Sequence, residues 1–172
     1  LIGCLDTPTT GTVIIDGDDV SGLDESELSA IRNEKIGFVF QQFNLLTKMS
    51  ILENVMTPLI YRRVPPRERI EQAMKALERV GLSDRLHHTP NELSGGQKQR
   101  AAIARALVTA PAIILADEPT GALDTATGNL ILDLFEEINR EGGTVIMVTH
   151  DPEVSVRCNR TVHLRDGLVE EV

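Results

Sequence analysis

Apolar residues along the chain follow two patterns, short unbroken runs and runs with helical spacing. The unbroken runs at 36–40, 112–116 and 144–149 predict buried strands. Two other segments, at 66–80 and 131–138, repeat apolar residues every three or four positions, as amphipathic helices do. These residues are Ile70, Ala73, Met74, Leu77 and Val80 in the first segment and Ile131, Leu134, Phe135 and Ile138 in the second. Apolar strands that alternate with helices predict an α/β fold, with a parallel sheet covered on both faces.

Weaker signals complete the pattern. The segment after residue 160 predicts a hairpin, in which Asp166-Gly167 forms the turn between strands at 161–164 and 168–172. The other predicted elements are a strand at 12–16 followed by a turn at Gly17 and helices at 23–32, 50–60 and 94–109.

The composition is that of a globular protein with one domain. The 172 residues are 41% hydrophobic and 25% charged, which argues against disorder. No apolar run approaches the roughly 20 residues of a membrane-spanning helix. Acidic residues outnumber basic ones by 26 to 17, and the net charge of −9 disfavours nucleic-acid binding, which requires a basic surface.

Two acidic residues, Asp117 and Glu118, follow the apolar run at 112–116. Ligands of open α/β sheets bind at this edge, beyond the carboxyl ends of the strands. One carboxylate there can hold Mg²⁺, and a second can orient or deprotonate an attacking water. The pair alone also fits a solvated cap on a strand, but the residues that follow, from Pro119 to Asp124, favour the catalytic interpretation.

A second polar motif opens the helix predicted at 94–109. Ser94 is followed three residues later by Gln97, which is the pattern of a capping box. The two glycines between them would also let backbone N–H groups approach an anion at the positive end of the helix dipole. The motif therefore predicts a helix cap and, in addition, an anion site.

Three motifs follow one another in a fixed order: Leu93 to Gln97, Asp117 to Asp124, and Thr149-His150. Ser94 lies 23 positions before Asp117, which itself ends an apolar strand. In this order and spacing the chain resembles the ATP-binding-cassette (ABC) ATPases over essentially its whole length. The segments at 40–45 and 116–124 further resemble the lipoprotein-release and macrolide-export group of that family.

The resemblance implies roles for single residues. Asp117 matches the Walker B aspartate that holds Mg²⁺, Glu118 the general base, and His150 the switch histidine that contacts the γ-phosphate of ATP. Gln41 matches the Q-loop glutamine, which touches Mg²⁺ and couples the site to a membrane partner. Asp124 matches the D-loop aspartate at a dimer interface. The signature that would meet ATP held by the opposite subunit comprises Ser94, Gly95, Gly96 and Gln97.

The resemblance also implies a fold and a function. The expected fold is the P-loop NTPase-like ABC ATPase fold, with one domain over 1–172, a helical subdomain at about 42–110 and a short C-terminal hairpin. The expected function is ATP hydrolysis, with ATP and Mg²⁺, that drives a separate membrane permease of an export or lipoprotein-release system. A homodimer or heterodimer of such subunits would act at the cytoplasmic face of the cell membrane.

Two alternatives remain open. The first is a soluble ABC ATPase that acts on nucleic acid or the ribosome. However, the 52 residues between Gln41 and Ser94 predict short helices, whereas chromosome-type members carry long coiled coils there. The acidic charge also disfavours a nucleic-acid partner. The other alternative is a catalytically incomplete cassette that lends only its signature to a complete one.

The phosphate-binding loop of the family, G-x-x-x-x-G-K-[ST], does not occur in the 172 residues. The family pattern starts in mid-helix at Leu1, so we expect an N-terminally truncated cassette rather than a degenerate one. Backbone donors and the lysine of that loop supply most phosphate contacts in such sites. We therefore expect these residues alone to bind ATP weakly and to be inactive.

Overall fold

The computed structural model describes residues 1–170 of the chain. At its centre lies a three-stranded parallel sheet in the order β3-β4-β5. These strands are β3 (Ile36–Phe40), β4 (Ile113–Asp117) and β5 (Thr144–Val148). Ile36 pairs with Ile113, which in turn pairs with Thr144, so the three strands start level with one another. The predicted parallel sheet is confirmed, and each strand begins within one residue of its predicted start.

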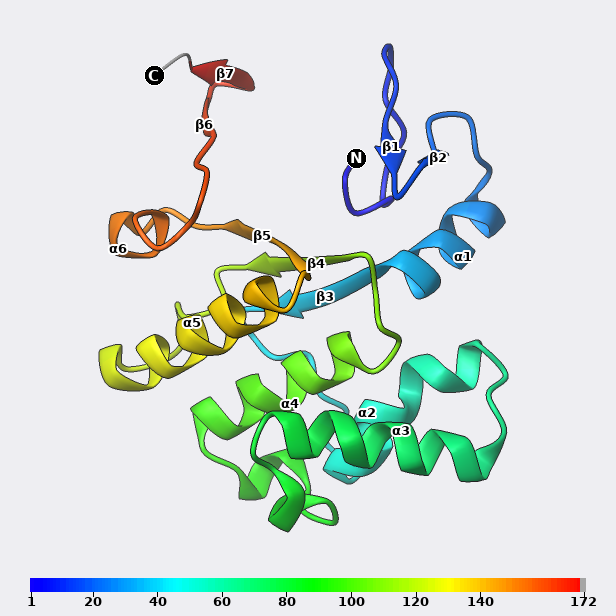
Figure 1. Ribbon diagram of the computed structural model, residues 1–172, viewed down its shortest axis with the longest axis vertical. Helices are drawn as coiled ribbons and strands as arrows, with labels where there is room; N and C mark the ends of the chain where they lie inside the picture. The colour runs from blue at the N-terminus through cyan, green and yellow to red at the C-terminus, as the bar shows by residue number, and fades with distance from the viewer. Residues whose placement is uncertain (171–172) are drawn as a thin grey trace.

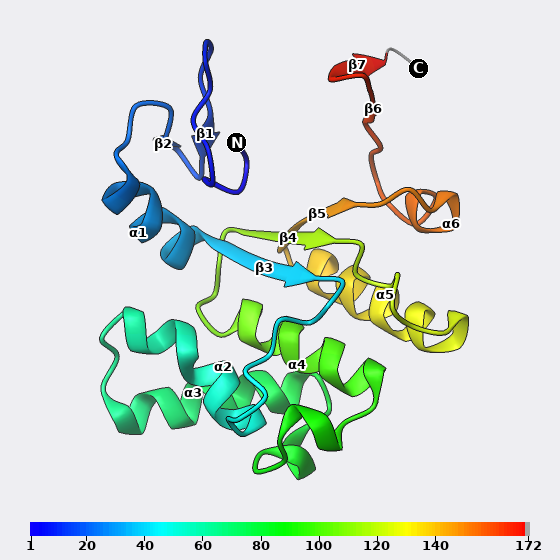
Figure 2. The ribbon, with the colours of Figure 1, turned by 180° about the vertical axis from the view of Figure 1, so that it is seen from behind.

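Helices cover one face of this sheet. Figures 1 and 2 show α2 (Ile51–Tyr61), α3 (Pro66–Arg79), α4 (Gly95–Leu107) and α5 (Thr125–Arg140) on the same side of it. Of these, α4 contacts β3, and α5 contacts both β5 and α4. On the opposite face the described residues place the N-terminal segment, where Gly3 lies against Phe38 and Leu115, instead of a helix.

The helices α2, α3 and α4 enclose the larger of two apolar cores. Leu59 of α2, Leu77 of α3 and Ile103 of α4 are buried in it together. The three helices lie within residues 42–110, the range predicted for a helical subdomain. Because α4 also contacts β3, the boundary between that subdomain and the sheet stays a prediction.

The buried face of α3 agrees only in part with the predicted one. Ile70 and Met74 are 42% and 45% exposed, although their spacing predicted burial. Ala73, Leu77 and Val80 are buried as predicted, and Ala76 is buried in addition. The face that α3 turns to α2 and α4 is therefore rotated toward Ala76, which leaves Ile70 and Met74 at its border.

Two hairpins lie at the ends of the chain. β1 (Ile14–Ile15) pairs with β2 (Asp18–Asp19), and β6 (His163–Arg165) pairs with β7 (Leu168–Glu170), both antiparallel. Each turn is an Asp-Gly pair in which both residues have positive φ, as two-residue hairpins favour. The C-terminal hairpin is thus confirmed, and positions 171–172 of its second predicted strand lie outside the described residues. The strand predicted at 12–16 is shorter, and its partner was not predicted because aspartate is rare in strands.

The remaining elements are short or lie at the edge of the sheet. Asp24 caps α1 (Glu25–Lys35) in a capping box with Glu27, which starts the helix two residues later than predicted. The others are α6 (Pro152–Ser155) and the 3₁₀ turns η1 (Ser83–Arg85) and η2 (Pro90–Glu92). Among residues 1–170, no helix combines the length and apolar character needed to span a membrane.

Candidate active site

The parallel register brings three sequence motifs to one edge of the sheet. Asp117 ends β4 and pairs with Phe40 of β3 and Val148 of β5. Gln41 directly follows Phe40, and Thr149-His150 directly follows Val148. Three segments that are far apart in the sequence therefore leave the sheet side by side, at the edge where α/β proteins bind ligands.

Glu118 is held by the segment that follows β5. Its backbone N–H donates to the carbonyl of Val148 at 2.9 Å. Its carboxylate accepts from the backbone N–H of His150 at 3.0 Å and from the hydroxyl of Thr149 at 3.1 Å. Nδ1 of the His150 ring lies 2.7 Å from the same carboxylate. The backbone of Glu118 has a φ of +43°, a left-handed conformation that is strained for a residue with a β carbon.

Burial and hydrogen bonds shift the pKa of Glu118 in opposite directions. Burial raises the pKa of this carboxyl, but the bonds from the His150 ring, the His150 backbone and Thr149 together outweigh burial. The pKa therefore lies below its ordinary value, and the carboxylate form is favoured. A carboxylate that is ionised and fixed at the strand edge can orient a water molecule and accept its proton.

Gln41 packs against the loop that follows Glu118. A β carbon added at Gly121 would lie 2.7 Å from Nε2 of Gln41, so a larger residue at position 121 would make this amide shift. The carboxylate of Asp117 and the amide oxygen of Gln41 are oxygen donors of the kind that Mg²⁺ prefers, and both side chains are exposed. Within residues 1–170, no cluster of three His, Cys, Asp or Glu forms a complete metal site. A cation held by these two residues would take its other ligands from water and phosphate.

The N-terminus of α4 has the predicted capping box. The N–H of Gln97 donates to the Ser94 hydroxyl at 3.3 Å, and the N–H of Ser94 donates to the Gln97 side chain at 2.9 Å. No acidic residue lies in the first turn, so the positive end of the helix dipole is not neutralised there. This end can accept an anion next to Gly95 and Gly96.

Asp124 has a local role that the sequence did not predict. Its carboxylate caps α5, accepting from the backbone N–H of Thr127 at 2.9 Å and from the Thr127 hydroxyl at 2.6 Å. The hydroxyl and the backbone N–H of Thr127 hold the pKa of Asp124 below its ordinary value. Contact of Asp124 with a second subunit stays a prediction.

Two further α4 residues, Gln99 and Arg105, link this helix to the loops of the site. Gln99 is fully buried and donates from Nε2 to the carbonyl of Pro119 at 2.7 Å. Arg105 donates to the carbonyls of Phe43 and Asn44, at 3.0 Å in the case of Phe43. Both residues look like ordinary polar positions of an amphipathic helix, so no pattern in the sequence predicts these contacts.

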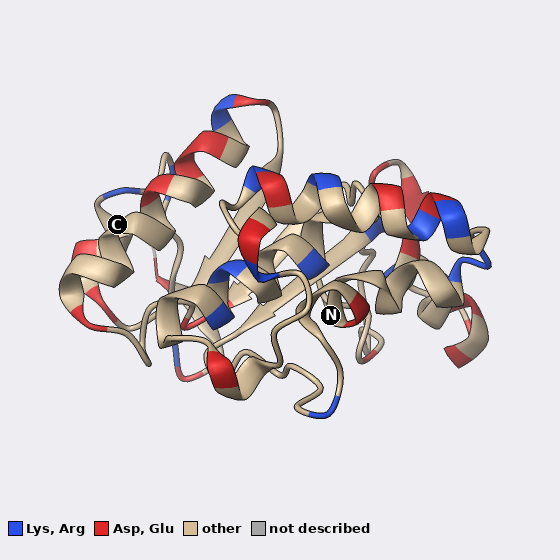
Figure 3. Ribbon diagram, turned by 90° about the horizontal axis from the view of Figure 1, so that it is seen from below, with Lys and Arg blue, Asp and Glu red and all other residues tan. Residues whose placement is uncertain are grey.

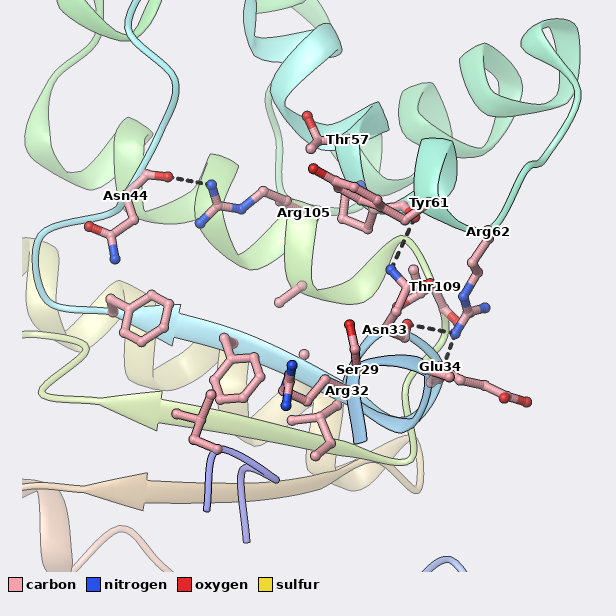
Figure 4. A pocket seen from close by; sticks show the side chains of 18 residues that line it. Ser29, Arg32, Asn33, Glu34, Asn44, Thr57, Tyr61, Arg62, Arg105 and Thr109 are labelled. Carbon is pink, nitrogen blue, oxygen red and sulfur yellow. Dashed lines mark hydrogen bonds between the residues drawn. The ribbon is translucent and has the colours of Figure 1, made fainter. Parts of the chain in front are cut away.

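Arg105 also lies at one end of a cavity beside β3, where its burial lowers the pKa of the guanidinium. The cavity has a volume of about 990 Å³ and lies between β3, α1, α2 and α4. Figure 4 shows Tyr61 above it and Arg62 at the far end, where the Arg62 guanidinium donates to the carbonyls of Asn33 at 3.0 Å and Thr109 at 2.9 Å. Phe38 and Phe40 line its floor, which therefore ends one residue before Gln41.

Replacing Arg105 with alanine is expected to destabilise the fold by about 1 to 3 kcal/mol. The change leaves the carbonyls of Phe43 and Asn44 without their donor, and both residues have left-handed backbones that this donor stabilises. Urea unfolding would measure the loss. Arg67→Ala is the matched control, since Arg67 is 92% exposed and its pair with Glu71 contributes at most about 0.5 kcal/mol. Equal effects in the two variants would contradict the assignment.

A family profile, curated proteins and solved structures that are similar to this chain all belong to the ABC transporters. The family profile described as "ABC transporter" matches residues 1–121. The uncharacterized ABC transporter ATP-binding protein YknY of Bacillus subtilis is 58% identical over 97% of this chain and 73% of its own length. The macrolide export ATP-binding/permease protein MacB of Bradyrhizobium diazoefficiens is 49% identical over 98% of this chain, which corresponds to 26% of that relative. A dimeric post-hydrolysis structure of the cassette MJ0796, bound to ADP and Pi, matches with a TM-score of 0.86 and 49% identity, over 99% of this chain and 75% of that one.

Proposed function

The chain belongs to the ABC transporter family, as an ATP-binding subunit, and from this premise we propose that it hydrolyses ATP to drive a separate membrane permease. The observation that carries the proposal is the carboxylate of Glu118, ionised and held by Thr149 and His150 at the edge it shares with Asp117 and Gln41. This arrangement fits a general base beside a metal-bound phosphate.

In the proposed reaction each of these residues has one role. A water molecule bound to Glu118 attacks the γ-phosphorus of ATP and passes a proton to the carboxylate as the bond to the β-phosphate oxygen breaks. Asp117 and Gln41 would hold Mg²⁺, which would neutralise charge on the phosphate oxygens. Nδ1 of His150 must carry a proton to donate to the Glu118 carboxylate, so Nε2 of the largely exposed ring can donate to a γ-phosphate oxygen only in the imidazolium form.

The proposed active form is a dimer of cassettes. Solved relatives of this chain form dimers. In our proposal the N-terminus of α4, with Gly95 and Gly96, meets the γ-phosphate of ATP bound to the other subunit, and Asp124 lies near the interface. The absence of an acidic side chain from the first turn of α4 supports this role. The second subunit is either another copy of this chain or a related cassette.

We further propose that the cavity beside β3 receives a segment of the permease. Its lining includes Phe40, which directly precedes Gln41, so a segment lying in it would come close to the proposed Mg²⁺ ligand. Its apolar floor is bordered by the guanidinium groups of Arg32, Arg62 and Arg105, which suit carbonyl groups and acidic side chains at a helix end. The chain would then act at the cytoplasmic face of the membrane. The similarity to MacB favours an export or lipoprotein-release system.

A nucleic-acid partner is not favoured. Figure 3 shows Lys and Arg interspersed with Asp and Glu along the helices, without a continuous basic face in that view. With a net charge of −9, such a surface would repel a phosphate backbone.

The proposal predicts a requirement for a phosphate-binding loop. We expect the 172 residues alone to bind ATP weakly and to show no appreciable turnover. We expect Mg²⁺-dependent hydrolysis in a loop-extended protein, in which a segment with the pattern G-x-x-x-x-G-K-[ST], taken from a relative, precedes Leu1. Phosphate release measured with and without Mg²⁺ tests both statements. Strong hydrolysis by the 172 residues alone would overturn the first, and an inactive loop-extended protein that folds would overturn the second.

A further inference from the structure

The N-termini of α4 and α5 pack against each other within one chain. A β carbon added at Gly96 would lie 2.4 Å from Cγ2 of Thr127, a separation that no real β carbon tolerates. A β carbon at Gly95 would lie 3.2 Å from Cδ2 of Leu123. Both glycines of the Ser94–Gln97 turn therefore contact the segment that starts α5, independently of any ligand.

Thr127 cannot easily move away from Gly96. Its backbone N–H and its hydroxyl both donate to Asp124, at 2.9 and 2.6 Å. Because threonine is branched at its β carbon, fixing the hydroxyl also fixes the methyl group. The methyl group that fills the space over Gly96 is thus held by the same carboxylate that caps α5.

A third contact joins the same two segments. The buried amide of Gln99, one turn further along α4, donates to the carbonyl of Pro119. This contact and the contact of Thr127 with Gly96 lie on either side of the 120–126 segment. The loop after Glu118 is therefore fixed to α4 at two points.

We propose that Thr127 is a positioning residue that joins the Ser94–Gln97 turn to the Asp124 turn, so that the two move as one body. Its methyl group requires glycine at position 96, and its hydroxyl group holds Asp124. The packing part of this proposal stands by itself. The functional part, in which Thr127 orients the turn toward ATP on a second subunit, rests on the function proposed above.

The packing is tested by a cycle of variants followed by thermal unfolding of the chain. Alanine normally stabilises a helix relative to glycine, so Gly96→Ala without a clash would raise the melting temperature. We expect it to fall by about 3 to 8 °C, as overpacking in a chain of this size does. Thr127→Ser removes the methyl group and keeps the hydroxyl, so the double variant should melt within about 2 °C of Thr127→Ser alone.

Two controls make the cycle specific. Thr127→Val keeps a group in place of the methyl and removes the hydroxyl, so it should not rescue Gly96→Ala. Gly22→Ala adds a β carbon with no heavy atom within 4 Å and should not lower the melting temperature. A Gly96→Ala variant that melts higher than the parent, or equal rescue by serine and valine, would overturn the packing.

The functional part is tested in the loop-extended protein carrying Glu118→Gln, by sedimentation with ATP. Gly96→Ala is expected to weaken ATP-driven dimerisation at least tenfold, and Thr127→Ser to recover it to within about threefold. If Gly96 serves only the phosphate of the other subunit, Thr127→Ser cannot rescue it, and that result would overturn the functional part. If the Glu118→Gln parent itself fails to dimerise, the proposed function fails, and the melting cycle still decides the packing.

Discussion

Replacing Glu118 with glutamine in the loop-extended protein is expected to slow ATP turnover by about 10²- to 10⁴-fold, the usual effect of losing a positioned base. Glutamine keeps the size and one acceptor oxygen of the side chain, so the bond from the His150 backbone can persist. Binding of ATP should remain largely intact, because Glu118 contributes no phosphate contact in the proposed site. The uncleaved ATP should therefore hold two subunits together.

Steady-state phosphate release measures the loss of turnover, and sedimentation with ATP measures the association of the two subunits. Thr149→Val is the informative companion, because it removes one of the bonds that lower the pKa of Glu118 and leaves the carboxylate in place. It should cost much less activity than Glu118→Gln. Turnover that is unchanged in Glu118→Gln would mean that this residue is not the base.

Replacing Ser94 with aspartate is expected to abolish dimer closure and hydrolysis without lowering the melting temperature. Aspartate is as good an N-cap as serine, and its charge is favourable at the positive end of α4. The same charge would face the γ-phosphate of ATP on the other subunit and repel it. The variant therefore separates capping, which it preserves, from contact with the nucleotide, which it prevents.

Ser94→Ala provides the contrast. It should cost about 1 kcal/mol of stability, because Ser94 accepts the N–H of Gln97 in the capping box. Mixing Ser94→Asp with Glu118→Gln subunits tests whether each site is built from both chains. In a mixed dimer, one such site would pair the intact Glu118 of the first chain with the intact Ser94 of the second, and the other site would carry both changes. A Ser94→Asp protein with normal hydrolysis would leave capping as the whole role of the turn and remove the main argument for a dimer.

The sequence predicted the elements and caps that depend on the pattern of neighbouring residues. The strand at 36–40 and the capping box of Ser94 and Gln97 follow from apolar runs and cap chemistry, and both are present in the structure. The convergence of Gln41, Asp117 and His150 at one edge follows from three parallel strands in register. The roles of these residues in binding and catalysis stay predictions.

Contacts between distant segments could not be predicted in this way. Arg105 donates to the carbonyl of Asn44, 61 residues earlier, and no periodicity encodes that pairing. Gln99 is polar, so the sequence predicts that its side chain is exposed. It is buried because its amide donates a hydrogen bond to the carbonyl of Pro119. The exposure of Ile70 depends on how far α3 is rotated against its neighbours, which spacing alone does not fix.

The left-handed backbone of Glu118 sets the chemistry proposed for this residue against the stability of the chain. Such a conformation costs of order 1 kcal/mol or more for a residue with a β carbon and almost nothing for glycine. A glycine here would relax the backbone and end the chemistry proposed for the carboxylate. The strain at Glu118 is thus a cost in stability that the chemistry proposed for its carboxylate would explain.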